Sequence, residues 1–292
     1  LTISTGVIQS YSRCHAQGYF RHRLHIREPE EKFYGIDAID IGNLVHHALQ
    51  DLDKVEQEIT PDADDIAATI KDCIRHNRAC RYLTSMQKSA LQTHLQNVIQ
   101  KWLGYRVAIH QDEAILNSQH EVVLKKSLFG VTFNIRVDRI DQLHDGSYRI
   151  IDYKTGMANR ADWLSTRPQN PQLIVYALSV PNTSSIAYAC LHPDHYGYSG
   201  YCAENKTIDG IKPINQIALT PPDAQEKIMN SWPRQIQMWQ ACIAEVIKEY
   251  RQGSLRLNPA QGKTTCQQCQ LQSICRLNER NIYREAHEYH PT

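Results

Sequence analysis

The sequence predicts a fold of the mixed α/β (α+β) class, in which a helical region precedes a sheet. Up to about residue 117, apolar residues recur every three or four positions, which is the period of amphipathic helices. From Gln119 the pattern changes to runs rich in β-branched and aromatic residues that are separated by tight-turn sequences. We therefore expect an N-terminal helical part, residues 1–118, and a sheet-bearing part, residues 119–292, that together form one structural unit.

The order of the elements follows from the same patterns. Helices are expected over about residues 3–24 and 36–57, with two more up to about residue 117, and Pro61 before Asp62 marks a helix start between two of them. Three strands are expected in HEVVLKKSLFG, VTFNIRVDRIDQL and SYRIIDYKTG, joined by turns at LFG and HDG. A short helix in NPQLIVYALSV, strands in SIAYACLHP and YGYSGYC, and a long amphipathic helix over about residues 222–251 complete the order.

Composition limits the possible partners. The 32 Lys and Arg residues nearly balance the 31 Asp and Glu residues, so the net charge is +1 and contact with a nucleic acid must come from local patches. The chain has no signal peptide and no apolar run of membrane-spanning length, so we expect a soluble, cytoplasmic protein. It opens on Leu1 and has no methionine before Met86, which suggests a domain of a longer polypeptide.

The segment RIIDYKTG, residues 149–156, ends a predicted strand on charged residues. Because side chains alternate between the faces of a strand, Asp152 and Lys154 point the same way and Tyr153 points the other way. Asp138 lies on the preceding strand, which the short HDG turn places alongside. Two carboxylates on adjacent strands can converge on a magnesium ion, with Lys154 beside the attacking water. An isolated DxK sequence more often forms a salt bridge, so the neighbouring motifs decide between the two interpretations.

Two further motifs flank these carboxylates in the chain. In GNLVHHALQ, His46 follows Gly42 by about one helical turn, and a neutral imidazole is a possible further metal ligand. After IDYKTG, Gln172 and Tyr176 are spaced i, i+4 on a predicted helix and share a face. Either motif alone is common in helices without a function.

The series GxxxH, VDRID, IDYKTG and QxxxY resembles the RecB-like branch of the PD-(D/E)XK nuclease superfamily in both order and separation. The resemblance implies a restriction-endonuclease-like mixed sheet flanked by helices. It also implies that His46, Asp138 and Asp152 hold magnesium or manganese, with the backbone carbonyl of Tyr153 as a further ligand. Lys154 would orient or deprotonate the water, while Gln172 and Tyr176 would border the site and the DNA.

Three of the nine cysteines lie close together, in CQQCQLQSIC, as Cys266, Cys269 and Cys275. This spacing is typical of a site for zinc or an iron-sulfur cluster. A fourth ligand is missing locally, and the resemblance supplies Cys14, since AddB-type nuclease domains and CRISPR-adaptation nucleases place one cysteine before the nuclease motifs and three after, around a 4Fe-4S cluster. Zinc is the alternative, because spacing alone does not separate the two kinds of site.

The leading hypothesis is a magnesium-dependent DNA exonuclease domain of a RecB- or AddB-like helicase-nuclease, which acts in DNA repair and recombination beside a helicase region or subunit. Arg139, Arg160 and Arg167 lie near the catalytic strands in sequence and are the candidates for DNA contact. Two alternatives stay open: a CRISPR-adaptation exonuclease with the same cysteine arrangement, and a non-catalytic iron-sulfur module that binds DNA.

Overall fold

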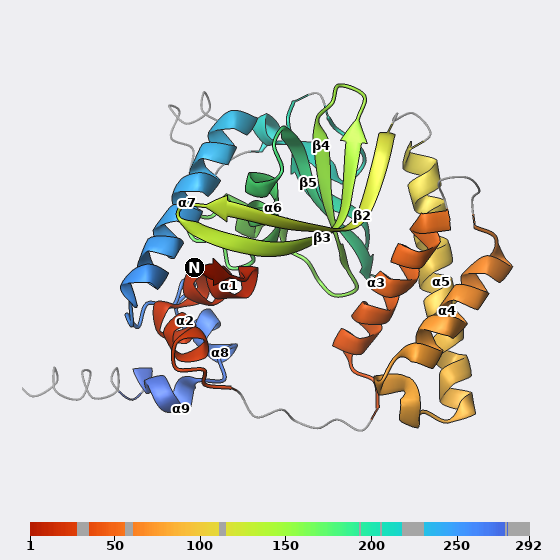
Figure 1. Cartoon of the computed structure of the whole chain (residues 1–292), viewed down its shortest axis with the longest axis horizontal. Helices are drawn as coiled ribbons and strands as arrows, with labels where there is room; N and C mark the ends of the chain where they lie inside the picture. Colours follow the sequence, from red (N-terminus) through yellow and green to blue (C-terminus); the bar gives the residue numbers. More distant parts are fainter. Residues whose placement is uncertain are drawn as a thin grey trace, which may run out of the picture.

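Seven strands form one mixed sheet at the centre of the part of the chain that the computed structural model describes, residues 1–27, 35–55, 61–110, 115–192, 194–204, 206–217, 231–277 and 279 (Figure 1). Their order across the sheet is β1-β3-β4-β5-β6-β7. Strand β2 lies outside this order and pairs with β3. The strands are β1 Thr2–Ile3, β2 Ile115–Leu128, β3 Val131–Leu143, β4 Tyr148–Lys154, β5 Thr183–His192, β6 His195–Cys202 and β7 Ile211–Pro213.

The expected three-strand meander is β2, β3 and β4, which pair antiparallel in sequence order. Phe129 and Gly130, with φ of 51° and 78°, make the first turn, and Gly146, with φ of 78°, lies in the second. Positive φ at both central residues is the conformation of the tightest hairpin turns, which match the twist of the flanking strands. Strand β5 then pairs parallel to β4, so the catalytic candidates on β4 lie inside the sheet rather than at its edge.

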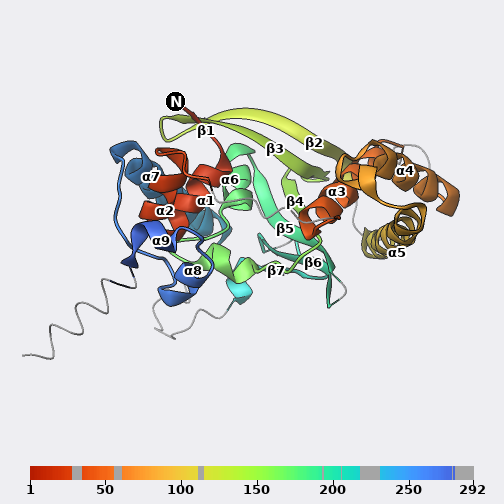
Figure 2. The ribbon, with the colours of Figure 1, turned by 90° about the horizontal axis from the view of Figure 1, so that it is seen from below.

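Helices cover both faces of this sheet (Figure 2). One hydrophobic core packs α1, α6 and α7 against one face, and a second packs α3, α4 and α5 against the other. The helices are α1 Thr5–Arg13, α2 His15–His22, α3 Ala38–Val55, α4 Ala63–His76, α5 Ser85–His110, α6 Gln172–Ser179, α7 Trp232–Gln252, α8 Lys263–Gln267 and α9 Gln272–Cys275. This architecture confirms the predicted fold class. No helix among the described residues is long and apolar enough to cross a membrane.

Strand β4 shows how the two cores divide the sheet. Ile150 is buried in the core with α6 and α7, whereas Ile151 and Tyr153 are buried in the core with α3 and α5. Successive residues of a strand face opposite sides, so Asp152 and Lys154 lie on the same face of β4 as Ile150.

Several boundaries differ from the predicted ones. The first predicted helix is two helices, α1 and α2, which break at Cys14, where φ is −164° and ψ is 131°. Ile3 belongs to β1 instead, and Asn117 to β2. Strands β1 and β7 were not predicted, because segments of two and three residues are too short to show the alternation of apolar and polar residues. Parts of three predicted helices, over 56–57, 111–114 and 222–230, lie outside the described residues.

Candidate active site

Strand β4 presents two charged side chains to one face of the sheet at its carboxyl end. Asp152 is 1% exposed and lies beside Tyr188 of β5 in the strand register. The Nζ atom of Lys154 lies 2.5 Å from Asp152 Oδ2, and the lysine side chain is about one third exposed. The aromatic ring of Tyr153 packs into the opposite core, where it makes an edge contact with Trp102 at 6.0 Å between centroids. This geometry confirms the predicted alternation of the three side chains.

The backbone of Tyr153 joins two of the predicted metal ligands. Its N–H donates to Asp138 Oδ2 at 2.9 Å, and its carbonyl oxygen accepts from His46 Nε2 at 2.9 Å. The Nδ1 atom of His46 lies 3.3 Å from Asp138 Oδ2. Gly42, one turn before His46, has no side chain, and this lets helix α3 approach the end of β4. A Cβ at Gly42 would lie only 3.3 Å from Thr155 Oγ1. The GxxxH motif therefore acts through a close approach of helix and strand.

Glu121 is the functional candidate that sequence reasoning missed. Ligand atoms of His46, Glu121 and Asp138 all lie within 4.8 Å of one another. Glu121 lies on β2, between residues that pair with neighbours of Asp138 on β3, and its φ is 51°. The hairpin turn could have revealed it: counting seven residues outward from the Leu128–Val131 pair reaches Glu121 on one strand and Asp138 on the other.

Burial and charge set the protonation of this group. Burial, together with the nearby carboxylate of Asp152, raises the pKa of Asp138 to about 8. Burial lowers the pKa of His46, although Asp152 opposes that shift. Since His46 Nε2 donates to a carbonyl, Nδ1 of the neutral ring is an acceptor, and protonated Asp138 can donate to it. The carboxylates of Glu121 and Asp138 and the imidazole of His46 suit a hard divalent cation such as magnesium or manganese. Such a cation would replace the proton of Asp138 when it binds.

Gln172 and Tyr176 lie together on α6. The side-chain amide of Gln172 donates to Tyr176 Oη at 2.8 Å. Burial is the main reason that the pKa of Tyr176 rises well above its usual range, and the charges of Asp152 and Asp138 raise it further. The phenol therefore stays protonated close to the carboxylates, where it can donate a hydrogen bond.

Arg139 does not occupy a position that could contact DNA. Its side chain is 5% exposed, and its Nε donates to Asp141 Oδ1 at 2.6 Å. Asp141 is itself fully buried, so the two charges form an internal ion pair. The prediction that Arg139 contacts DNA is corrected accordingly, because its guanidinium is held inside the sheet.

Arg160 and Arg167 also bind parts of the fold. Arg160 donates to two backbone carbonyls, that of Gly210 at 2.6 Å and that of Gly200 at 3.3 Å. Arg167 donates to the carbonyl of Asn258 at 2.6 Å and to that of Tyr11 at 3.2 Å. Both side chains are half-buried. Proximity in sequence to the catalytic strands indicated DNA contact. Both guanidinium groups bind backbone carbonyls of the fold, and their contact with DNA stays a prediction.

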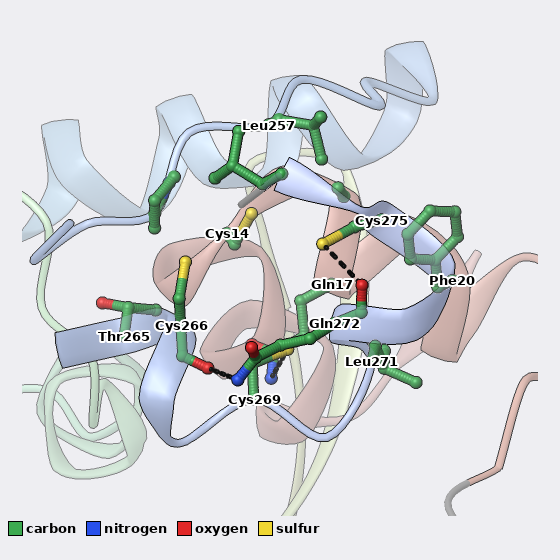
Figure 3. A pocket seen from close by; sticks show the side chains of 13 residues that line it. Cys14, Gln17, Phe20, Leu257, Thr265, Cys266, Cys269, Leu271, Gln272 and Cys275 are labelled. Atoms are coloured by element: carbon green, nitrogen blue, oxygen red, sulfur yellow. Dashed lines mark hydrogen bonds between the residues drawn. The ribbon is translucent and has the colours of Figure 1, made fainter. Parts of the chain in front are cut away.

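The four predicted cluster ligands line one cavity (Figure 3). Cys14 comes from the break between α1 and α2, and Cys266, Cys269 and Cys275 come from α8, the turn after it and α9. Gln17 Nε2 lies 3.7 Å from Cys269 Sγ. The rest of the lining is mainly apolar, with Phe20, Leu257 and Leu271 among it. The remaining five cysteines are not part of this lining.

Four thiols around an apolar cavity fit an iron-sulfur cluster or a soft metal ion. Burial raises the pKa of Cys266 and of Cys269, and the neighbouring thiols raise both further. Such thiols lose their protons readily when a metal binds, since the metal then supplies the positive charge. The donor set and its surroundings therefore suit the predicted cluster.

Comparison with known proteins identifies the class to which this fold and site belong. The profile of the PD-(D/E)XK nuclease superfamily matches residues 2–276. The chain therefore belongs to the PD-(D/E)XK nuclease superfamily.

One relative among curated proteins is a subunit of the ATP-dependent helicase/deoxyribonuclease of Oceanobacillus iheyensis, which is 25% identical over 180 residues. The match covers 52% of this chain but 15% of that relative. Two solved structures are similar at lower identity. A protein of Eubacterium rectale described as a candidate exonuclease has 16% identity and a TM-score of 0.41, over 86% of this chain and 82% of that one. A protein called SSO0001 has 14% identity and a TM-score of 0.31, over 89% and 93%.

Proposed function

We propose that this chain is the magnesium-dependent deoxyribonuclease domain, an exonuclease, of a helicase-nuclease that acts in DNA repair and recombination. The observation that carries the proposal is the convergence of His46, Glu121 and Asp138 beside the Asp152–Lys154 pair. Membership of a nuclease superfamily and the name of the matched relative support it. That relative is a helicase/deoxyribonuclease subunit, so a helicase region or subunit is the proposed partner.

We propose a role for each residue of the site, and their positions support these roles. His46, Glu121, Asp138 and Asp152 would hold magnesium or manganese, with the carbonyl of Tyr153 as a further ligand. A cation bound there would stabilise the negative charge that develops on the phosphate oxygens. The ammonium of Lys154 is partly exposed and next to Asp152, so it can orient the attacking water by a hydrogen bond. Water then attacks phosphorus, the bond from phosphorus to the leaving oxygen breaks, and the proton that the water gives up is taken up by the leaving oxygen.

The test is Asp152→Ala, measured as degradation of linear DNA in magnesium. We expect a loss of about 100-fold or more, because the variant removes a buried carboxylate at the reacting centre. Asp194→Ala is the matched control, since the side chain of Asp194 is 86% exposed. An Asp152→Ala protein that is folded and degrades DNA as fast as the parent would show that the site assignment is wrong.

We also propose that the four thiols bind a 4Fe-4S cluster. The four donors and their mainly apolar surroundings support this proposal. A zinc site would use the same four thiols, so the metal content decides between the two.

Metal analysis tests the cluster proposal directly. Protein purified without oxygen should be brown and contain about four iron atoms per chain. A colourless protein with one zinc per chain would contradict the proposal while leaving the nuclease assignment intact.

A further inference from the structure

A second cavity opens directly beside the catalytic lysine. Lys154 and Gln172 line it together with side chains of α1 and of the segments on either side of residues 160–164. Its volume is about 260 Å³. This is slightly less than the roughly 300 to 1,000 Å³ of pockets for drug-sized ligands, so one nucleotide-sized group fits and a duplex does not. Because Lys154 belongs both to the cavity and to the candidate active site, a group bound in the cavity would lie next to the reacting phosphate.

The lining of this cavity is rich in neutral hydrogen-bonding groups. Carboxamides come from Gln9, Asn159, Asn170 and Gln172, and a hydroxyl comes from Thr5. Among the described residues, no carboxylate lines the cavity, and the one cation that does, Lys154, is paired with Asp152. A phosphate would be met by free cations, whereas carboxamides offer both donors and acceptors, as the edges of nucleobases do. Met157, Ala158 and Tyr188 add apolar surface for the face of a ring.

Two of these carboxamides are held in a fixed relation. Gln9 Nε2 donates to Asn170 Oδ1 at 2.8 Å, and the backbone N–H of Asn170 donates to Asp162 at 2.7 Å. Within the described part of the chain, Gln9 Oε1 and Asn170 Nδ2 have no protein partner. One acceptor, on Gln9, and one donor, on Asn170, are therefore left without a protein partner in the lining of the cavity, and these are the groups with which carboxamides pair with base edges.

We propose that this cavity is a base-binding subsite, in which Gln9 and Asn170 contact the nucleobase of the nucleotide next to the cleaved phosphate. The inference rests on the proposed function, because the ligand is part of the DNA substrate. It makes α1, a helix far from β4 in sequence, part of the substrate-binding surface.

The experiment compares single-stranded oligonucleotides that carry one abasic residue at successive positions with the intact oligonucleotide. For the wild-type protein, an abasic residue next to the cleaved phosphate should lower kcat/KM about tenfold, since loss of one bound base costs on this scale. Gln9→Ala should lower kcat/KM for the intact strand by a similar factor and show little further loss on the abasic strand. Gln237→Ala, a glutamine exposed on α7, is the matched control and should behave as the wild type.

Asn170→Asp provides a second variant that keeps the size of the side chain and the acceptor for Gln9. It removes the donor, so the difference between intact and abasic strands should shrink here too. The inference is overturned if the abasic penalty is equal in the wild type, Gln9→Ala and Asn170→Asp, or if no position shows a penalty. A wild-type protein that neither cleaves oligonucleotides in magnesium nor binds them in calcium would instead overturn the proposed function, and the subsite with it.

Discussion

Asp138 and His46 share a proton at the centre of the candidate site. The raised pKa of Asp138, about 8, and the lowered pKa of His46 keep the carboxyl protonated and the imidazole neutral near pH 7. The 3.3 Å separation of His46 Nδ1 from Asp138 Oδ2 allows that proton to lie between them. A cation must displace the proton to use both ligands, so binding should strengthen as the pH rises toward 8.

Folding stability without a cation should depend on pH in the opposite direction. The pKa of Asp138 is about 8 in the folded state against 3.8 ordinarily, so between these values the folded chain holds a proton that the unfolded chain has released. The stabilisation is complete below pH 4 and is lost as the pH rises through 8. In EDTA, the free energy of unfolding should fall between pH 6.5 and 8, by at most about 1.4 kcal/mol per pH unit.

Urea unfolding of the wild type and of Asp138→Asn measures this slope. The asparagine cannot titrate, so the variant should lose less stability over the same pH range. Asp194→Asn, at an exposed carboxylate, should keep the wild-type slope. Equal slopes for the wild type and Asp138→Asn would contradict the assigned protonation.

The sequence identified most side chains of the candidate site but not all of them. His46, Asp138 and the carbonyl of Tyr153 lie together as expected, and their roles as ligands stay predictions. Glu121 was missed because it belongs to no short motif, and its position depends on the register of a hairpin. Arg139 was assigned wrongly because a sequence does not show that Asp141, two residues away, will be its buried partner.

At the scale of elements, the junction of α1 and α2 governs how Cys14 is presented. No proline or glycine at this point signals a break. The break follows instead from hydrogen bonds to the distant segment 256–260: Ala16 N–H donates to Arg256 O at 3.1 Å, and Ala260 N–H donates to Arg13 O at 2.8 Å. Helical periodicity could not predict it, because these partners lie about 240 residues away in the chain.

Gly18 allows α1 and α2 to pack closely, and its replacement should be costly. A Cβ at Gly18 would lie 2.1 Å from the ring of Tyr11, which is fully buried. Gly18→Ala should therefore lower the free energy of unfolding by about 1 to 3 kcal/mol. Gly104→Ala is the matched control in α5, where no atom of the described part of the chain outside the helix lies within 4 Å of the added Cβ. It should raise the free energy of unfolding by about 0.5 to 1 kcal/mol.

Urea unfolding of the two variants measures both effects. Opposite signs would support the packing described for α1 and α2. A Gly18→Ala protein as stable as the wild type would mean that Tyr11 can move, and that the two helices are less tightly packed.

At the scale of the whole molecule, segments from opposite ends of the sequence form one end of the structure. Helices α1 and α2 lie beside α8 and α9 in both views (Figures 1 and 2). Hydrogen bonds join α2 to the segment that leads from α7 to α8, among them His15 N–H to Asn258 Oδ1 at 3.0 Å, and Nδ1 of His15 lies 3.3 Å from a carboxylate oxygen of Glu249 on α7. The spacing of three cysteines and the family resemblance together brought both sides of this contact into one predicted site, but neither indicated the hydrogen bonds.

Loss of one proposed cluster ligand should therefore weaken this end of the molecule without unfolding the rest. Cys14→Ser should lower the iron content and the Tm of protein purified without oxygen. Cys242→Ser is the matched control, because a serine there can keep the hydrogen bond to Thr166 O. Iron analysis and thermal unfolding report the outcome, and unchanged iron in Cys14→Ser would remove Cys14 from the ligand set.

The backbone conformation of Glu121 should lower the stability of the whole chain. A glutamate at φ of 51° is strained, and glycine at such a position usually improves stability. Glu121→Gly should raise the Tm of the cation-free protein, because it relieves the backbone strain and removes a carboxylate, 9% exposed, that repels the charge of Asp138. The same change should weaken manganese binding in calorimetry, and unaltered binding would exclude Glu121 as a ligand. Selection of variants for thermal stability alone should therefore favour glycine at position 121. The selected proteins would lack the carboxylate of Glu121 and, with it, one proposed ligand of the cation.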